Sequence, residues 1–474
     1  MNPRSIVAVS VWVGLGCLAI GAMDGPLRLS YDNPRYFTDR SGKAIYLAGA
    51  HTWNNLVDMG PTDPPTAFGY EKFLDLLESH HHNVFRLWAW HHFESTWELS
   101  HRIAPLPWVR TGPGEALDGK PRFDLTAFDP AYFDRLRERV RAAQDRGIYV
   151  SVMLFEGWGL QFNPQPWRGH PFHASNNING INGDPNGSGK GLEIQSWELP
   201  PGVWEIEKAY VRKVVDTVND FDNVLYEVVN EAGPYSTQWQ YQVIHFVRVY
   251  ESEKPKRHPI GMTFQHEGGS NQDLFNSPAD WISPNPAGGY REDPPVASGA
   301  KVILNDTDHL WGIGGNRAWV WKSFCRGLNV LFMDPYDDIK EGGGIYTTGN
   351  VVKHKLTPAL LNEIRAALGH TRQWADRLPL KRMTPQSNLA SSGYCLANLQ
   401  RGAEEFLIYA PPGPAVSVDL SNVQGVVDVE WFDPGTGESR RVAEVSGGLR
   451  RELAAPFAGD AVLHLKRKAE ERKP

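Results

Sequence analysis

The residues best suited to chemistry stand at positions 230 and 231, where an asparagine precedes a glutamate. They end a run of β-prone apolar residues, 224–229, that follows a helical stretch and leads into Gly233 and Pro234. This pattern is typical of a buried parallel strand with polar residues at its carboxyl end. There, Asn230 could hold a sugar hydroxyl, and Glu231 could protonate a leaving glycosidic oxygen. The plainer interpretation is a core strand that ends on a surface glutamate.

An arginine on a second predicted strand points to the same interior. Side chains alternate along a strand, so Glu227 shares a face with Glu231. The strand predicted over 83–90 places Arg86 and Trp90 on one face. A buried arginine is costly unless it is paired, so we expect Arg86 to contact Glu227.

Cleavage of a glycosidic bond needs a second carboxyl group on the other side of the bond. Asp306 and Asp308 follow the apolar strand predicted over 302–304 and supply two candidates. Either one could be the nucleophile, Asp306 could instead tune Asp308, or no nucleophile stands here. Aspartate is one methylene shorter than glutamate. The sequence therefore leaves open a retaining gap of about 5–5.5 Å or an inverting gap of about 6.5–9.5 Å.

Other polar and aromatic side chains at predicted strand ends are candidates for substrate contact, although each could be merely structural. We expect Arg86 to order the carboxylates and Asn230 to bind a sugar hydroxyl. The full set of substrate-binding candidates is His51, Trp53, Arg86, Trp90, Glu156, Trp158, Asn230, His266 and Trp311.

Several other classes of function lack their signatures in this sequence. The runs 80–82 and 91–92 are rich in histidine, but the His-Glu-x-x-His spacing of zinc sites is absent, so we expect no metal. No cofactor is expected either. The net charge is −7 without a basic run in the body of the chain, which does not suggest a nucleic-acid partner. A peptidase lacks support, because there is neither a metal motif nor a Gly-x-Ser-x-Gly elbow.

The elements around these residues alternate between strand and helix, which predicts a parallel (β/α)8 TIM barrel over 27–380. A short β-rich lead-in occupies 27–43, and the segments 91–122 and 160–200 are predicted as long loops that wall the site. The strands are predicted at 44–50, 83–90, 149–155, 224–231, 259–264, 280–283, 302–304 and 329–333, and the helices at 70–79, 129–146, 203–221, 238–251, 316–325 and 357–377.

Both ends of the chain differ from this pattern. Short strands separated by Pro/Gly turns predict an antiparallel β-sandwich domain over 384–468. Residues 1–22 combine a positive start, an apolar stretch and small residues, as in a secretory signal peptide. We therefore expect a secreted or periplasmic protein without stable membrane association if the signal is cleaved. An uncleaved anchor is the alternative. Cys325 and Cys395 could pair or stay free.

The strand over 224–231 resembles the fourth barrel strand of clan A glycoside hydrolases, which runs Tyr-Glu-Ile-x-Asn-Glu. Tyr226, Glu227, Asn230 and Glu231 match that pattern. The resemblance implies that Glu231 is the general acid/base and that a nucleophile ends the seventh strand. That strand departs from the clan, which has a glutamate there. A related barrel family carries Asp-x-Glu at this place, which aligns Asp308 with the nucleophile.

Residues 30–380 as a whole resemble bacterial barrels that precede a domain labelled collagen-binding-like. The similarity is carried by 170–172, 176–180 and 306–312, and in the last domain by 431–437. It implies a secreted hydrolase of O-glycosidic bonds in a poly- or oligosaccharide, with retention of configuration. The alternative is a barrel that binds glycan or matrix without cleaving it, in which Asp308 marks a lost nucleophile.

Overall fold

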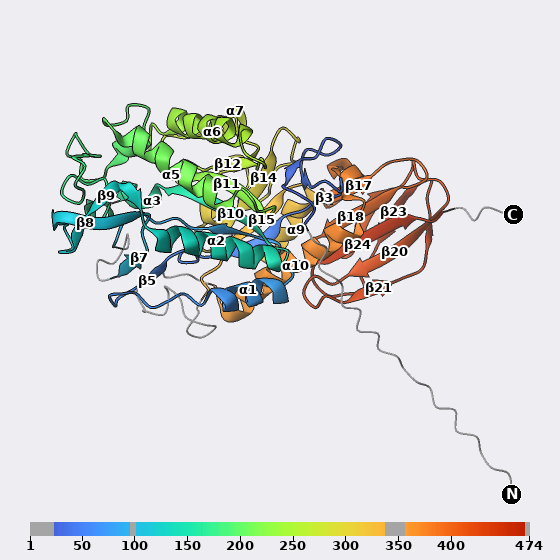
Figure 1. Cartoon of the computed structure of the whole chain (residues 1–474). Coiled ribbons are helices and arrows are strands. Elements are labelled where there is room, and N and C mark those ends of the chain that lie inside the picture. Colours follow the sequence, from blue (N-terminus) through green and yellow to red (C-terminus); the bar gives the residue numbers. More distant parts are fainter. Residues whose placement is uncertain (1–22, 95–100, 163, 337–355, 470–474) are drawn as a thin grey trace, which may run out of the picture.

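A computed structural model describes the protein over residues 23–94, 101–162, 164–336 and 356–469. Eight strands form one sheet in which every hydrogen-bonded pair is parallel, in the order β4-β15-β14-β13-β12-β11-β10-β6. Figure 1 labels β10, β11, β12, β14 and β15 of this sheet. The predicted signal segment, 1–22, lies outside the described residues. The strands are β4 (Ala48–His51), β6 (Val84–Leu87), β10 (Tyr149–Glu156), β11 (Val224–Asn230), β12 (Ile260–Thr263), β13 (Trp281–Ser283), β14 (Val302–Asp306) and β15 (Asn329–Met333).

The sheet closes between β4 and β6 through the side chain of Asn83. Its amide nitrogen donates to the Tyr46 carbonyl at 2.8 Å, and its amide oxygen accepts from the Ala48 N–H at 2.9 Å. The strands approach so closely that a Cβ on Gly49 would lie 1.9 Å from the Val84 carbonyl oxygen, so only glycine fits there. The predicted TIM barrel is confirmed.

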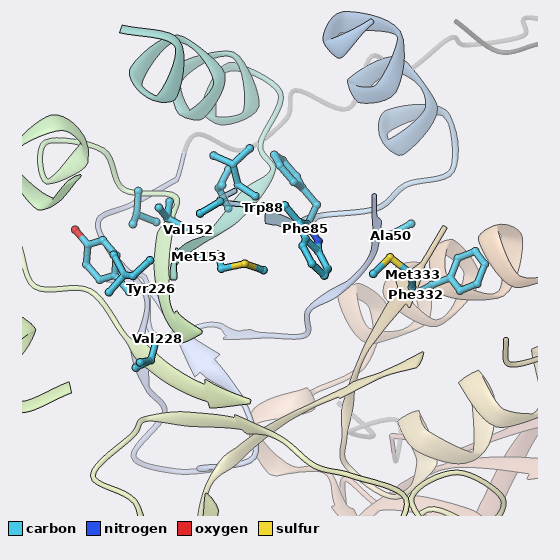
Figure 2. Packing of buried hydrophobic residues seen from close by; sticks show 14 of the residues in the cluster. Ala50, Phe85, Trp88, Val152, Met153, Tyr226, Val228, Phe332 and Met333 are labelled. Atoms are coloured by element: carbon cyan, nitrogen blue, oxygen red, sulfur yellow. The ribbon is translucent and has the colours of Figure 1, made fainter. Parts of the chain in front are cut away.

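Helices cover the outside of the barrel and bury their apolar faces against it. The Phe73 ring on the first helix, for example, meets Phe85 on β6 edge to face, with centroids 5.7 Å apart. Figure 2 shows this core, with labelled side chains from several strands. The helices are α1 (Tyr70–Ser79), α2 (Pro130–Asp145), α5 (Val203–Val218), α6 (Thr237–Ser252), α7 (Asn271–Asn276), α8 (Thr307–Leu310), α9 (Arg317–Cys325) and α10 (Pro358–Arg377).

Apolar side chains fill the amino-terminal part of the barrel interior. Val84, Leu225, Trp281, Leu304 and Leu331 belong to one buried cluster there. This plug leaves the carboxyl ends of the strands as the place where polar residues can gather, as in other barrels of this fold.

Two sequence predictions of secondary structure are wrong near the start of the chain. The single strand predicted over 44–50 is divided: β3 (Ala44–Ile45) pairs antiparallel with β2 (Phe37–Thr38), and β4 joins the barrel. The described part of the segment 91–122 is not simply a loop, because β8 (Trp108–Glu115) and β9 (Pro121–Phe128) form an antiparallel hairpin. Its register shifts near residues 110–115, where Gly112, Pro113 and Gly114 hide the alternation expected of a strand.

The segment 160–200 is mostly irregular, as predicted, with short helices α3 (Trp158–Phe162), α4 (Pro164–Arg168) and η1 (Leu192–Gln195). Its buried amides hold the segment itself. Asn176 donates to the carbonyls of Arg168 and His170, and Asn177 donates to that of Pro171 and accepts from the Ile181 N–H. These side chains are therefore structural.

The C-terminal strands form the predicted antiparallel β-sandwich. The larger sheet runs β16-β17-β18-β24-β20-β21, and β19 pairs with β23 in a second, two-stranded sheet. Cys395 on β17 and Cys325 on α9 are free and buried. The strands are β16 (Thr384–Pro385), β17 (Cys395–Asn398), β18 (Glu405–Ala410), β19 (Val416–Asp419), β20 (Val426–Phe432), β21 (Ser439–Arg441), β23 (Arg450–Leu453) and β24 (Ala461–Arg467).

Both faces of the larger sheet are covered. Alternate residues such as Val429 and Leu465 pack with Val418 of the second sheet. On the other face, the Phe432 ring lies 5.7 Å from Trp321 of α9 and 5.8 Å from Trp374 of α10, measured between centroids. The C-terminal domain is therefore packed on the barrel (Figure 1). Among the described residues, no helix is long and apolar enough to cross a membrane.

Candidate active site

The guanidinium of Arg86 organises the carboxyl end of the barrel. Its Nε and Nη2 donate to Glu227 at 2.8 and 2.5 Å, so the expected pair forms. Nη1 donates to Asp306 at 3.1 Å and to Asp308 at 2.9 Å, and Nη2 also donates to Asn230 Oδ1 at 2.6 Å. These contacts use the five N–H groups of an arginine side chain. One buried cation thus faces three carboxyl groups.

Asp306, like Glu227, is a fully buried member of this set. His51 Nε2 lies 3.0 Å from its Oδ2, and the Trp88 indole N–H donates to His51 Nδ1 at 3.0 Å. Because an indole can only donate, Nδ1 is the acceptor and Nε2 carries the proton toward Asp306. Asp306 Oδ1 also accepts the Asp308 N–H at 3.0 Å and caps α8. Burial opposes ionisation, but His51 and Arg86 outweigh it and hold the pKa of Asp306 well below its ordinary value.

Asp308 has a different environment two residues further on. Its side chain is 9% exposed, against 0% for Asp306. Its Oδ2 bonds to Arg86, and His309 Nε2 lies 3.6 Å from the same oxygen. Burial and the charge of Asp306 raise the pKa of Asp308 to about 6, against the opposing effect of Arg86. Its Oδ1 accepts no hydrogen bond from the described part of the chain, so this oxygen is available to a ligand.

Two residues that the sequence analysis missed fix the Asn230 amide. His309 Nε2 lies 3.2 Å from Asn230 Oδ1, and His309 Nδ1 lies 2.7 Å from the Ser283 hydroxyl. Burial and Arg86 lower the pKa of His309 to about 3, so the ring is neutral near pH 7. With its oxygen fixed by Arg86 and His309, Asn230 keeps its NH₂ group for a ligand hydroxyl. The only sequence signal for His309 was its position directly after Asp308.

Glu231 follows β11 with a left-handed backbone, φ 44°. Its carbonyl accepts a hydrogen bond from the Gln161 amide, and its carboxyl accepts none from a residue that the structure describes. Burial, Asp308 and Glu156 raise the pKa of Glu231 well above its ordinary value, despite Arg86. A buried, protonated carboxyl group without a competing donor is suited to general acid catalysis.

Glu156 ends the neighbouring strand and lies level with Asn230 in the β10–β11 ladder. Its Oε1 accepts the Gly159 N–H at 2.7 Å, and its carbonyl accepts from the Gln195 amide at 2.9 Å. Burial raises the pKa of Glu156 to about 8, although the backbone N–H groups oppose the shift. Glu156 is therefore mostly neutral near pH 7, and its charge opposes ionisation of Glu231 as the pH rises.

The predicted tryptophans divide into buried and rim positions. Trp90 has no exposed surface, stacks on Trp88 with centroids 5.7 Å apart, and donates to the Trp53 carbonyl at 2.6 Å. It therefore supports the wall behind the site. Trp53 is also buried, whereas Trp158, which begins α3, and Trp311, which follows α8, are partly exposed.

Trp311 and His266, both partly exposed, have contacts to neighbouring side chains through their rings. The Arg291 guanidinium covers the Trp311 ring at 5.4 Å from its centroid. His266 is half-buried and meets Phe264 edge to face at 6.0 Å, and Phe264 meets His309 in the same way at 6.2 Å. His266 is thus connected to the polar cluster through one aromatic ring. Among the described residues, no group of three or more His, Cys, Asp or Glu side chains is arranged to hold a metal ion.

Comparison with known proteins assigns the C-terminal domain to a described family. Residues 380–465 match the family described as "Putative collagen-binding domain of a collagenase". No curated protein matches the chain. The predicted similarity to this type of domain is confirmed.

Solved structures resemble the chain over both domains. One, named "Glycoside hydrolase", is 12% identical, with a TM-score of 0.57, and the match covers 94% of this chain and 98% of that one. A glycoside hydrolase family 5 protein from Bacteroides vulgatus is 12% identical, with a TM-score of 0.57 and 95% coverage of each chain. Residues 380–465 are 86 of the 474 residues, so both matches extend beyond the barrel. The chain therefore has the fold of these glycoside hydrolases, a TIM barrel followed by a β-sandwich.

Proposed function

We propose that the protein is a glycoside hydrolase that cleaves O-glycosidic bonds of an oligo- or polysaccharide. One observation carries the proposal: Glu231 and Asp308 meet at one end of the barrel in environments that separate their roles. Glu231 keeps its proton, and Asp308 ionises beside Arg86. A protonated and an ionised carboxyl group are the two groups that glycosidic cleavage needs.

Asp308 suits the nucleophile better than Asp306. Asp306 has no exposed surface and accepts hydrogen bonds from His51, Arg86 and the Asp308 backbone. Attack on a sugar carbon requires a free lone pair, which Asp308 retains on Oδ1. Asp306 is then the residue that orients Arg86 and the start of α8.

The proposed reaction proceeds in two steps with retention of configuration. Glu231 gives its proton to the glycosidic oxygen as the bond to the anomeric carbon breaks, and an Asp308 oxygen forms an ester to that carbon. The leaving sugar departs as an alcohol. Glu231, now ionised, then takes a proton from water, whose oxygen attacks the anomeric carbon and releases Asp308. Asn230 would hold a hydroxyl of the bound ring. A signal peptide at 1–22 would deliver the enzyme to extracellular or periplasmic glycans.

Hydrolysis of a panel of aryl glycosides and polysaccharides by the wild type, Asp306→Asn and Asp308→Asn tests this proposal. We expect the wild type to cleave at least one substrate, with the product anomer retained by NMR. Asp308→Asn should lose at least about a hundredfold in kcat with little fall in melting temperature. The amide removes the attacking carboxylate, but its oxygen can still accept from Arg86, and burial already opposes ionisation of Asp308. Asp306→Asn should lower the melting temperature as well, because one of its two buried acceptor oxygens becomes an NH₂ group that faces other donors.

Two outcomes would count against the proposal. A wild type that cleaves nothing but is retarded in polysaccharide gels would favour the glycan-binding barrel instead. If Asp306→Asn alone abolished activity and kept full stability, the nucleophile would be Asp306.

The pH dependence of kcat/KM should distinguish the two aspartates as well. Activity should fall as the pH drops through about 6, because Asp308 must be ionised to attack. If Asp306 were the nucleophile, its lowered pKa would keep activity level down to about pH 4. At high pH, activity should fall again as Glu231 loses its proton. Initial rates from pH 4 to 9 on one aryl glycoside are the measurement, and a flat profile between pH 4 and 7 would contradict the role of Asp308.

A further inference from the structure

Two solvent-facing aromatic residues follow the strands that carry Glu156 and Glu231. Trp197 is 63% exposed and Tyr235 is 84% exposed. Among the large hydrophobic residues of the described chain that are exposed, the only other aromatic one is Tyr31, at 97%. Tyrosine and tryptophan are enriched at interfaces, because each combines a large apolar ring with a polar end.

Contacts between the two loops place these rings near the acid. Tyr235 stands four residues beyond Glu231, and Trp197 stands two residues beyond Gln195, which binds the Glu156 carbonyl. The loops touch where a Cβ on Gly233 would lie 2.8 Å from the Leu192 side chain. Both residues therefore lie on adjacent loops on the side of the barrel that carries Glu231.

The backbone of Tyr235 is unusual for an exposed tyrosine. Its φ is 69°, in the left-handed region that favours glycine. Such a conformation costs on the order of 1 kcal/mol or more, and it persists most often at binding and catalytic sites. Because the ring is 84% exposed, packing of the ring offsets little of this cost.

We propose that Trp197 and Tyr235 are stacking positions for pyranose rings on the leaving-group side of the scissile bond. The inference rests on the proposed function, because Glu231 protonates the leaving oxygen and the sugars attached to that oxygen extend past its loop. The apolar C–H faces of pyranose rings suit flat contact with the apolar faces of aromatic rings. The substrate class is therefore a glycan chain and not a glycoside of a single sugar.

The test is retardation in native gels that contain hydroxyethylcellulose, glucomannan or xylan, together with hydrolysis kinetics. Trp197→Ala and Tyr235→Ala should each weaken retardation about five- to tenfold, in line with the worth of an aromatic contact. KM for the retarding polysaccharide should rise by the same factor. Trp197→Phe and Tyr235→Phe should keep most of the affinity, because each retains a flat ring.

Tyr31→Ala is the matched control. Tyr31 is at least as exposed, but it lies in the lead-in, where its neighbour Asp32 pairs with Lys381 at 2.7 Å. Equal loss in this variant, unchanged retardation in both alanine variants, or no retardation of the wild type in any gel would overturn the inference. Retardation without hydrolysis would overturn the proposed function and, with it, the assignment to the leaving-group side. Hydrolysis of aryl glycosides without retardation would overturn this inference alone.

Discussion

Glu231→Gln is expected to lower kcat about a thousandfold on polysaccharides and on aryl glycosides with poor leaving groups. Glutamine keeps the size of the side chain but has no proton to give to the departing oxygen. A dinitrophenolate leaves without protonation, so formation of the glycosyl–enzyme ester from dinitrophenyl glycosides should be nearly as fast as in the wild type. The measurement is a plot of log kcat/KM against the pKa of the leaving group. The slope of this plot should be steeper for the variant than for the wild type.

Azide provides a second diagnosis of the same residue. Water needs Glu231 as a base to attack the Asp308 ester, whereas azide is already an anion and attacks without proton transfer. Added azide should therefore restore turnover of dinitrophenyl glycosides by Glu231→Gln and yield a glycosyl azide of retained configuration.

Glu156→Gln is the matched control, because Glu156 is also buried and protonated near pH 7 and ends the adjacent strand. Its substitution should change kcat/KM by the same factor for every leaving group, so the dependence on leaving-group pKa should match that of the wild type. A steep leaving-group dependence in Glu156→Gln, with a shallow one in Glu231→Gln, would move the general acid from β11 to β10.

The parts of the site that lie along one strand could be predicted from the sequence. The β-prone run before Asn230 and Glu231 defines β11, and its alternation places Glu227 inside the barrel, where Arg86 needs a partner. Both inferences depend on local periodicity and on the cost of a buried charge. The confirmed barrel follows from the same periodicity, repeated along the chain.

Other features depend on contacts that periodicity does not encode. His309 reaches Asn230 across 79 residues, and Trp88 sets the protonated nitrogen of His51. Residues 112–114, Gly-Pro-Gly, indicate a loop, yet the hairpin accommodates them through a shift in register. The asparagine-rich run that begins at Asn176 resembles a set of sugar-binding amides. In the structure, the buried Asn176 amide donates instead to the backbone carbonyls of Arg168 and His170.

Arg86→Met is expected to destabilise the fold by about 3–5 kcal/mol, the usual cost of leaving buried charges uncompensated. The variant would leave Glu227, Asp306 and Asp308 in the barrel interior without their shared cation. Methionine approximates the aliphatic part of the arginine, so loss of charge and of hydrogen bonds dominates the effect. The measurement is the free energy of unfolding in urea at pH 7, with tryptophan fluorescence as the signal for unfolding.

Arg146→Met is a matched control, because Arg146 also contacts three carboxylates but does so at the surface. Its distances to Glu71 and Asp75 are 2.8 and 2.5 Å, yet the side chains of these partners are 68% and 66% exposed. Water stabilises those carboxylates when the arginine is removed, so the loss should stay below about 1 kcal/mol. Equal losses in the two variants would show that burial adds nothing to the Arg86 cluster.

The loss in Arg86→Met should also depend on pH. Without Arg86, the folded-state pKa values of Asp306 and Asp308 rise, so the folded variant binds more protons than the folded wild type does. A raised folded-state pKa makes the folded protein less stable as the pH increases. The difference in the free energy of unfolding between variant and wild type should therefore narrow as the pH is lowered from 7 to 5. The double variant Arg86→Met/Glu227→Leu should recover part of the lost stability at pH 7, because it removes one of the buried carboxylates that lack their cation. A gap that is constant with pH would instead mean that Arg86 supports the barrel through packing, and that its five hydrogen bonds contribute little to the charge balance of the site.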